Sequence, residues 1–172
     1  LITVGCIAAD SIKIKTDSPG KQVVEFAYRV PSGFDSKQTD GYRIMVLFGG
    51  RNWQGDRTIK AYKFDDFADK HKMFLISPSF KDEDYWEPEK WSGKALFAAI
   101  SELEKRYGLK DCRLYFYGYS AGGQCANLFY AYAPERVDAW AAHACGVYFN
   151  ANKLKNGVPA LITCCYGDND RC

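Results

Sequence analysis

Five short apolar runs, separated by more polar stretches, set the possible folds of this sequence. Each run is almost continuously apolar instead of alternating, which is typical of parallel strands that are covered on both faces. The runs are YRIMVLFGG (42–50), MFLISPSF (73–80), RLYFYGYS (113–120), DAWAAHACG (138–146) and PALITCCYG (159–167). Together they predict a parallel sheet at the centre of the fold.

The stretches between these runs have the periodicity of helices. The predicted helices extend from about Thr58 to His71, from Glu87 to Tyr107 and from Ala121 to Ala133. Ahead of them, SIKIKT (11–16) and QVVEFAYRV (22–30) alternate apolar and polar residues, which predicts an antiparallel hairpin. Because strands and helices alternate along the rest of the chain, we expect an α/β fold with a doubly wound, mostly parallel sheet and flanking helices.

Length and charge narrow the class of protein. With 172 residues, of which 47% are hydrophobic, the chain suits a single domain, 1–172, with a core of its own. Its 23 basic and 21 acidic residues give a net charge of +2 without a long run of one sign, so neither nucleic acid nor an anionic membrane is indicated as a partner. The expected partner is a small or neutral molecule.

The seven cysteines indicate neither a disulfide framework nor a metal site. Seven is an odd number, so the cysteines cannot all pair within the chain, and we expect mostly free thiols. No pair of cysteines has the spacing to histidines that is typical of zinc sites. We therefore expect no metal and no cofactor.

The first residues leave the cellular location open. The chain begins LITVGCIAAD without a methionine, so we expect a fragment or a processed form. This apolar opening is too short to cross a bilayer, and no membrane-spanning segment is expected. Cys6 after Gly5 is compatible with a lipoprotein cleavage site, and an edge strand is the alternative interpretation.

The segment GYSAG (118–122) lies between a predicted strand and a predicted helix. In this context it is a G-x-S-x-G nucleophile elbow, a sharp turn that exposes the oxygen of Ser120 at the C-terminal edge of the sheet. Packing alone or phosphate binding are alternative roles for such a turn. The phosphate-binding patterns G-x-x-x-x-G-K-[ST] and G-x-G-x-x-G do not occur here, which favours the nucleophile.

A serine nucleophile of this kind needs two backbone donors for the negative oxygen that forms during acyl transfer. The amide of Ala121, directly after the serine, is the first predicted donor. The loop at Gly49 and Gly50 ends an earlier buried run, and we expect Gly50 to supply the second. Two glycines that only end a strand are the alternative.

On these motifs, from the Gly49-Gly50 loop through the elbow to PALITCCYGDND, the chain resembles the α/β-hydrolases, particularly small esterases related to polyhydroxybutyrate depolymerases and feruloyl esterases. The resemblance implies a Ser-His-Asp triad. Its acid follows a strand in a G-x-x-D pattern, which matches Gly167 to Asp170 and designates Asp170, with Asp168 as the alternative. An ordinary turn after the strand is the other interpretation of these acidic residues.

The family order of serine, acid and then histidine leaves the base unassigned. The sequence ends at Cys172, two residues after Asp170, and we therefore expect the catalytic histidine to lie outside these residues. His71 precedes its strand and so belongs at the opposite edge of the sheet from Ser120. His143, late in its own run, is expected to line the pocket, and a role as base is the alternative.

Aromatic residues near the predicted site suggest the pocket wall. The segment SFKDEDYWEPEKW (79–91) contributes Tyr85 and Trp86, and Trp53 follows the glycine loop. Such a wall suits a sugar ring or an aromatic acyl group, although these residues could equally serve packing. We therefore expect a serine hydrolase, a carboxylesterase acting on a small-molecule ester. A peptidase of the same fold and a non-catalytic binding module are the alternatives.

Overall fold

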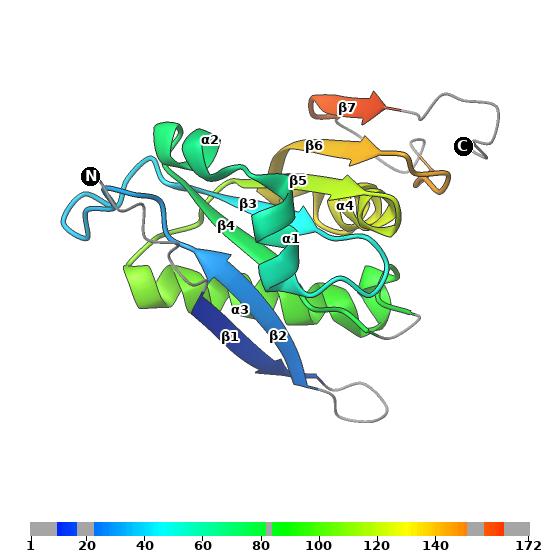
Figure 1. The fold of residues 1–172 in the computed structure, drawn as a ribbon, viewed down its shortest axis with the longest axis horizontal. Helices are drawn as coiled ribbons and strands as arrows, with labels where there is room; N and C mark the ends of the chain where they lie inside the picture. Colours follow the sequence, from blue (N-terminus) through cyan, green and yellow to red (C-terminus); the bar gives the residue numbers. More distant parts are fainter. Residues whose placement is uncertain (1–9, 17–22, 82–83, 151–156, 164–172) are drawn as a thin grey trace.

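The computed structural model describes residues 10–16, 23–81, 84–150 and 157–163. In these residues a single seven-stranded sheet forms the centre of the fold (Figure 1). Its strands are β1 (Asp10–Lys15), β2 (Val23–Arg29), β3 (Arg43–Phe48), β4 (Met73–Pro78), β5 (Leu114–Tyr119), β6 (Val137–His143) and β7 (Ala160–Thr163). All five predicted parallel strands are present, and so is the hairpin.

The strands lie in the order β1-β2-β4-β3-β5-β6-β7. β1 and β2 pair antiparallel, as predicted for the hairpin, and β2 then pairs antiparallel with β4. The remaining neighbours, from β4 to β7, pair parallel. The predicted fold class is therefore confirmed: a mostly parallel α/β sheet, in which β3 and β5 lie side by side at the centre.

Helices cover both faces of the sheet (Figure 1). The helices are α1 (Gly55–Tyr62), α2 (Asp65–Lys70), α3 (Gly93–Tyr107) and α4 (Ala121–Tyr132), with a π-helical turn η1 (Pro88–Ser92) and a 3-10 turn η2 (Pro134–Arg136). The last predicted helix matches α4, and the second matches η1 and α3 taken together. The prediction of one helix from Thr58 to His71 is wrong, because Lys63 adopts a left-handed φ of 53° and separates α1 from α2.

The core consists of two apolar layers, one on each face of the sheet. Residues that alternate along the central strands point to opposite faces, as the two-residue period of a strand requires. On one face Met45 and Leu47 pack with Ile59 of α1. On the other, Val46 and Phe48 belong to the larger cluster with residues of α3 and α4. The central strands are thus covered on both faces, which explains their nearly continuous apolar sequence.

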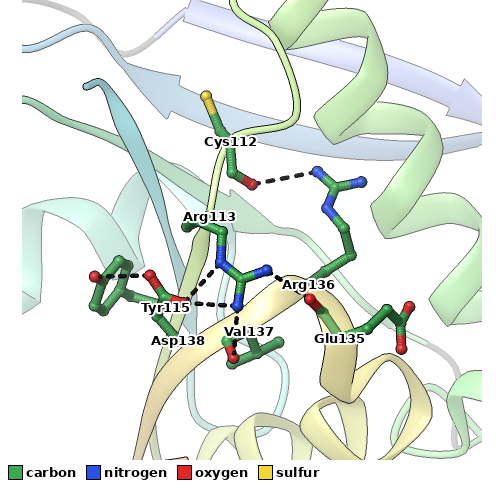
Figure 2. Close-up of polar contacts among 7 residues, drawn as sticks. All are labelled: Cys112, Arg113, Tyr115, Glu135, Arg136, Val137 and Asp138. Carbon is green, nitrogen blue, oxygen red and sulfur yellow. Dashed lines mark hydrogen bonds and ion pairs between the residues drawn. The ribbon is translucent and has the colours of Figure 1, made fainter. Parts of the chain in front are cut away.

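A polar network ties the beginning of β5 to the beginning of β6 (Figure 2). The Nε and Nη2 atoms of Arg113 lie 2.7 and 2.6 Å from Oδ1 of Asp138, and Nη1 donates to the carbonyl of Glu135 at 2.5 Å. The Tyr115 hydroxyl donates to the other carboxylate oxygen of Asp138 at 3.2 Å. This network fixes β5 and β6 relative to each other at their N-terminal ends.

Apolar side chains are exposed at the β7 edge of the sheet. Leu161 and Ile162 of β7 are 56% and 50% exposed. A shallow hollow of about 290 Å³ lies over β5, β6 and β7, with Tyr117, Ala141 and Leu161 among its lining residues.

Among the described residues, none of the helices is both long and apolar enough to cross a membrane.

Candidate active site

Ser120 occupies the turn between β5 and α4 in an unusual backbone conformation. Its φ and ψ are 56° and −123°, a region that non-glycine residues adopt at a cost of about 1–3 kcal/mol. A serine before a helix normally caps it with its hydroxyl, yet Ser120 makes no capping hydrogen bond to α4. The turn therefore leaves the hydroxyl of the half-buried Ser120 at the C-terminal edge of the sheet and does not use it to cap the helix.

The two glycines of the motif are required by close backbone approach. A Cβ atom on Gly118 would overlap the backbone of Gly122, one turn later. A Cβ atom on Gly122 would overlap the carbonyl groups of Phe48 and Gly49, at the end of β3. Strand, elbow and helix thus approach more closely than side chains permit, which holds the strained serine in place.

The predicted oxyanion donors belong to neighbouring strand ends. β3 and β5 pair in parallel up to Phe48 and Gly118, so the loop at Gly50 and the elbow leave the sheet side by side. Ala121 is the first residue of α4, and the amides of a first helical turn have no partner within the helix. The roles of Gly50 and Ala121 remain predictions, and the structure brings both residues to the same edge of the sheet.

Tyr62, which the sequence does not indicate as a site residue, connects these two strand ends. The hydroxyl of Tyr62, the last residue of α1, donates to the carbonyl of Phe48 at 2.8 Å and accepts from the amide of Tyr119 at 3.2 Å. Burial raises the pKa of Tyr62 above its usual value, so the hydroxyl remains protonated. No local sequence signal marks Tyr62, because both of its partners are distant in the chain.

The predicted pocket residues separate into two groups. Trp53 and Tyr85 line a small cavity together with Gly49 and Gly50, next to the predicted oxyanion loop. Trp86 stands outside this cavity, with the guanidinium of Arg51 over its ring at 5.8 Å. The structure therefore places Trp53 and Tyr85 beside the loop, whereas Trp86 contacts Arg51, the residue that follows Gly50.

The side chains of the two histidines make no contact with Ser120 in the described part of the chain. His71 follows α2 and precedes β4, so it lies at the N-terminal ends of the parallel strands, as predicted. The His143 ring packs on Tyr117, with centroids 4.9 Å apart, and its Nδ1 atom contacts the hydroxyl of Thr163. Only the backbone of His143 reaches the elbow, where its carbonyl accepts from the Ser120 amide at 2.8 Å.

The predicted triad acid lies outside the described residues, and so does its alternative. Asp170 and Asp168 both follow Thr163, the last residue that the structure describes. Within the described part of the chain, no three His, Cys, Asp or Glu side chains are placed to hold a metal ion. Its free cysteines Cys112, Cys125 and Cys145 are all buried.

Comparison with known proteins finds similarity at the level of structure. No protein-family model and no curated protein sequence matches the chain. It is similar to a thermostable esterase, with a TM-score of 0.66 and 18% identity over 90% of this chain and 46% of that one. It is also similar to an acetyl xylan esterase from Aspergillus awamori, with a TM-score of 0.62 and 16% identity over 86% of this chain and 57% of that one.

A third similar structure is a poly(3-hydroxybutyrate) depolymerase from Bordetella parapertussis, with a TM-score of 0.61 and 18% identity over 87% of this chain and 59% of that one. The chain thus spans about half the length of these three solved structures. At these identities the likeness establishes the fold. The chemistry depends on the elbow, the neighbouring loop and the cavity.

Proposed function

We propose, from the α/β-hydrolase fold that this chain adopts, that it is a serine hydrolase with Ser120 as its nucleophile. The observation that carries the proposal is the strained conformation of Ser120, held between Gly118 and Gly122 where neither position has room for a side chain. Backbone strain of this kind persists only where the surrounding structure enforces it, and it concentrates at functional sites.

In this proposal the Ser120 hydroxyl attacks the carbonyl carbon of an ester and gives its proton to a histidine. The amides of Gly50 and Ala121 stabilise the negative oxygen of the tetrahedral intermediate. The alcohol then departs with the proton from the histidine, which leaves the acyl group on Ser120. Water, activated by the same histidine, releases the acid and restores the hydroxyl.

The base and the acid of the triad belong to the proposal, and Asp170, the proposed acid, lies outside the described residues. His71 is at the wrong edge of the sheet, and the ring of His143 is directed toward Tyr117 and Thr163. The base is therefore a histidine other than these two. Asp170 would orient it, as the resemblance to the family implies.

Esters are the preferred substrate class. The three similar structures are an esterase, an acetyl xylan esterase and a depolymerase of a polyester. The small cavity beside Gly50 has room for about one oxygen-sized group, which favours substrates with small groups next to the carbonyl. We therefore propose a carboxylic ester hydrolase that acts on small-molecule esters.

The test is covalent labelling of the full natural protein with a fluorophosphonate, followed by mass spectrometry of the labelled peptide. We expect the label on Ser120, and we expect hydrolysis of p-nitrophenyl acetate. Both should disappear in Ser120→Ala. Ser101→Ala, which removes an exposed serine of α3, is the matched control and should leave both unchanged.

Two results would overturn the proposal. Labelling that persists in Ser120→Ala would assign the nucleophile to another residue. A natural protein that neither reacts with the reagent nor hydrolyses esters would favour the binding module, while faster hydrolysis of amides than of esters would favour a peptidase.

A further inference from the structure

Tyr85 carries a buried hydroxyl group that the fold itself does not use. It lies in the segment after β4, and only 4% of the residue is exposed. Its oxygen atom is fully buried and has no hydrogen-bond partner among the described residues. Buried hydroxyl groups are nearly always paired, so an unpaired one at the edge of a candidate active site calls for a partner.

The contacts of Tyr85 prevent the ring from turning its hydroxyl to solvent. The buried hydroxyl of Ser92 donates to the Tyr85 carbonyl at 2.6 Å and fixes the backbone. The ring stacks on Phe80, with centroids 5.5 Å apart and planes at 25°. Trp86 packs edge-on from another side at 5.0 Å. The direction of the hydroxyl is therefore set before any ligand binds.

Tyr85 lines the same small cavity as Gly49, Gly50 and Trp53. The cavity has a volume of about 10 Å³, which is about the space that one oxygen-sized group needs. Gly50 and Trp53 are only partly buried, so this side of the cavity lies near the surface, at the predicted oxyanion loop. A substrate carbonyl held by that loop would lie next to the cavity.

The Tyr85 hydroxyl is suited to donate a hydrogen bond. Burial raises its pKa to about 12, and it therefore keeps its proton at neutral pH. The Arg51 guanidinium acts on the same group and lowers its pKa, a smaller effect than that of burial. A neutral donor in a fixed position forms a hydrogen bond with an acceptor oxygen, whereas a methylene group offers it no acceptor.

We propose that Tyr85 determines specificity by donating a hydrogen bond to an oxygen atom in the acyl group of the substrate. The inference rests on the proposed function, because it needs an acyl group that is bound at Ser120 beside Gly50. The acyl chain begins at the carbonyl carbon, so its first few atoms are those next to the loop. Preferred substrates are esters of short acids that carry an ether or hydroxyl oxygen close to the carbonyl.

A pair of substrates of equal size separates this role from a general effect on the fold. p-Nitrophenyl methoxyacetate and p-nitrophenyl butyrate differ by an oxygen in place of a methylene, so only the first offers an acceptor. kcat/KM is measured for both with the full natural protein, with Tyr85→Phe and with Tyr42→Phe. Tyr42 is also buried, and its hydroxyl accepts from the Asp35 amide at 3.1 Å, ahead of β3 and far from the loop.

We expect Tyr85→Phe to lower kcat/KM for the methoxyacetate by at least about tenfold while the butyrate value changes less than about twofold, because a site built to pair an oxygen discriminates strongly. The melting temperature should not fall, since the variant removes an unpaired hydroxyl. Tyr42→Phe should leave the ratio of the two substrates unchanged.

The outcomes distinguish this inference from the proposed function. If Ser120 is labelled and both esters are hydrolysed but the substrate ratio is the same in Tyr85→Phe, the inference is wrong and the function stands. An equal loss on both substrates, or a lower melting temperature with an unchanged ratio, overturns it as well, because the hydroxyl would then support the fold. A protein without Ser120 labelling refutes the proposed function itself.

Discussion

Replacing Tyr62 with phenylalanine removes one hydroxyl group that serves two strand ends. That hydroxyl joins the carbonyl of Phe48, two residues before Gly50, to the amide of Tyr119, which directly precedes Ser120. The parallel ladder between β3 and β5 ends at Phe48 and Gly118, and the Tyr62 hydroxyl continues the connection beyond it. The variant keeps the ring, and with it the packing of Tyr62 on Tyr117.

The size of the effect follows from two lost hydrogen bonds. Each contributes about 0.5–1.5 kcal/mol, so the variant should be less stable by about 1–3 kcal/mol. For a chain of this length this corresponds to a melting temperature lower by about 2–12 °C. Without the connection, the Gly50 and Ala121 amides lose their fixed spacing, and a shift of about 1 Å in such groups can reduce the rate about a hundredfold.

The assay is steady-state hydrolysis of p-nitrophenyl acetate by the full natural protein, well below the melting temperature of every variant. We expect kcat to fall and KM to stay within about twofold, because the oxyanion donors act on the transition state more than on the bound ester. Tyr42→Phe is the control for the loss of a buried tyrosine hydroxyl and should retain its kcat.

Two results would contradict the positioning role of Tyr62. If Tyr62→Phe loses stability but keeps its kcat, the hydroxyl supports the fold without positioning the donors. If KM rises and kcat is unchanged, Tyr62 affects the binding of substrate and not the alignment of the oxyanion hole.

Three further predictions concern single residues. Ser120→Gly should raise the free energy of unfolding by about 1 kcal/mol, because glycine adopts the positive φ without strain, and denaturation that shows a loss would contradict this. His143→Ala should reduce ester hydrolysis less than about tenfold, whereas a loss of about a thousandfold would make His143 the base. Arg29 holds the pKa of Asp69 at about 2, so Asp69→Asn should lower the melting temperature at pH 7. That difference should shrink as the pH falls from about 4 to about 2, and one that persists at pH 2 would exclude the ion pair as its cause.

Much of the fold could be predicted because burial leaves a direct mark on the sequence. Strands covered on both faces need apolar residues at nearly every position, as in β3 and β4, and the half-exposed hairpin alternates. The resemblance to α/β-hydrolases is confirmed at the level of the fold. The break between α1 and α2 could not be predicted, because the left-handed residue there is Lys63 and neither glycine nor proline marks the position.

The candidate site was predictable where its residues are close together in the sequence. Ser120 with its two glycines is one local pattern, and the structure explains each position by backbone geometry. Tyr62 could not be found in this way, since its hydrogen bonds reach residues 14 and 57 positions away. The unpaired hydroxyl of Tyr85 is equally invisible in the sequence, because pairing depends on the whole surroundings of the atom. The role of Asp170 stays a prediction.

The position of β3 between β4 and β5 also has a consequence for synthesis of the protein on the ribosome. β3 can pair with β4 soon after both have been made, but its other edge has to wait for β5, about 70 residues further along. At about 5–20 residues per second this interval lasts about 4–14 s. During that time the nascent chain exposes an apolar strand edge, which can pair with other chains. The ribosome thus makes Gly50 long before Ser120. Until β5 has been made and has paired with β3, aggregation competes with formation of the sheet edge at which both residues lie.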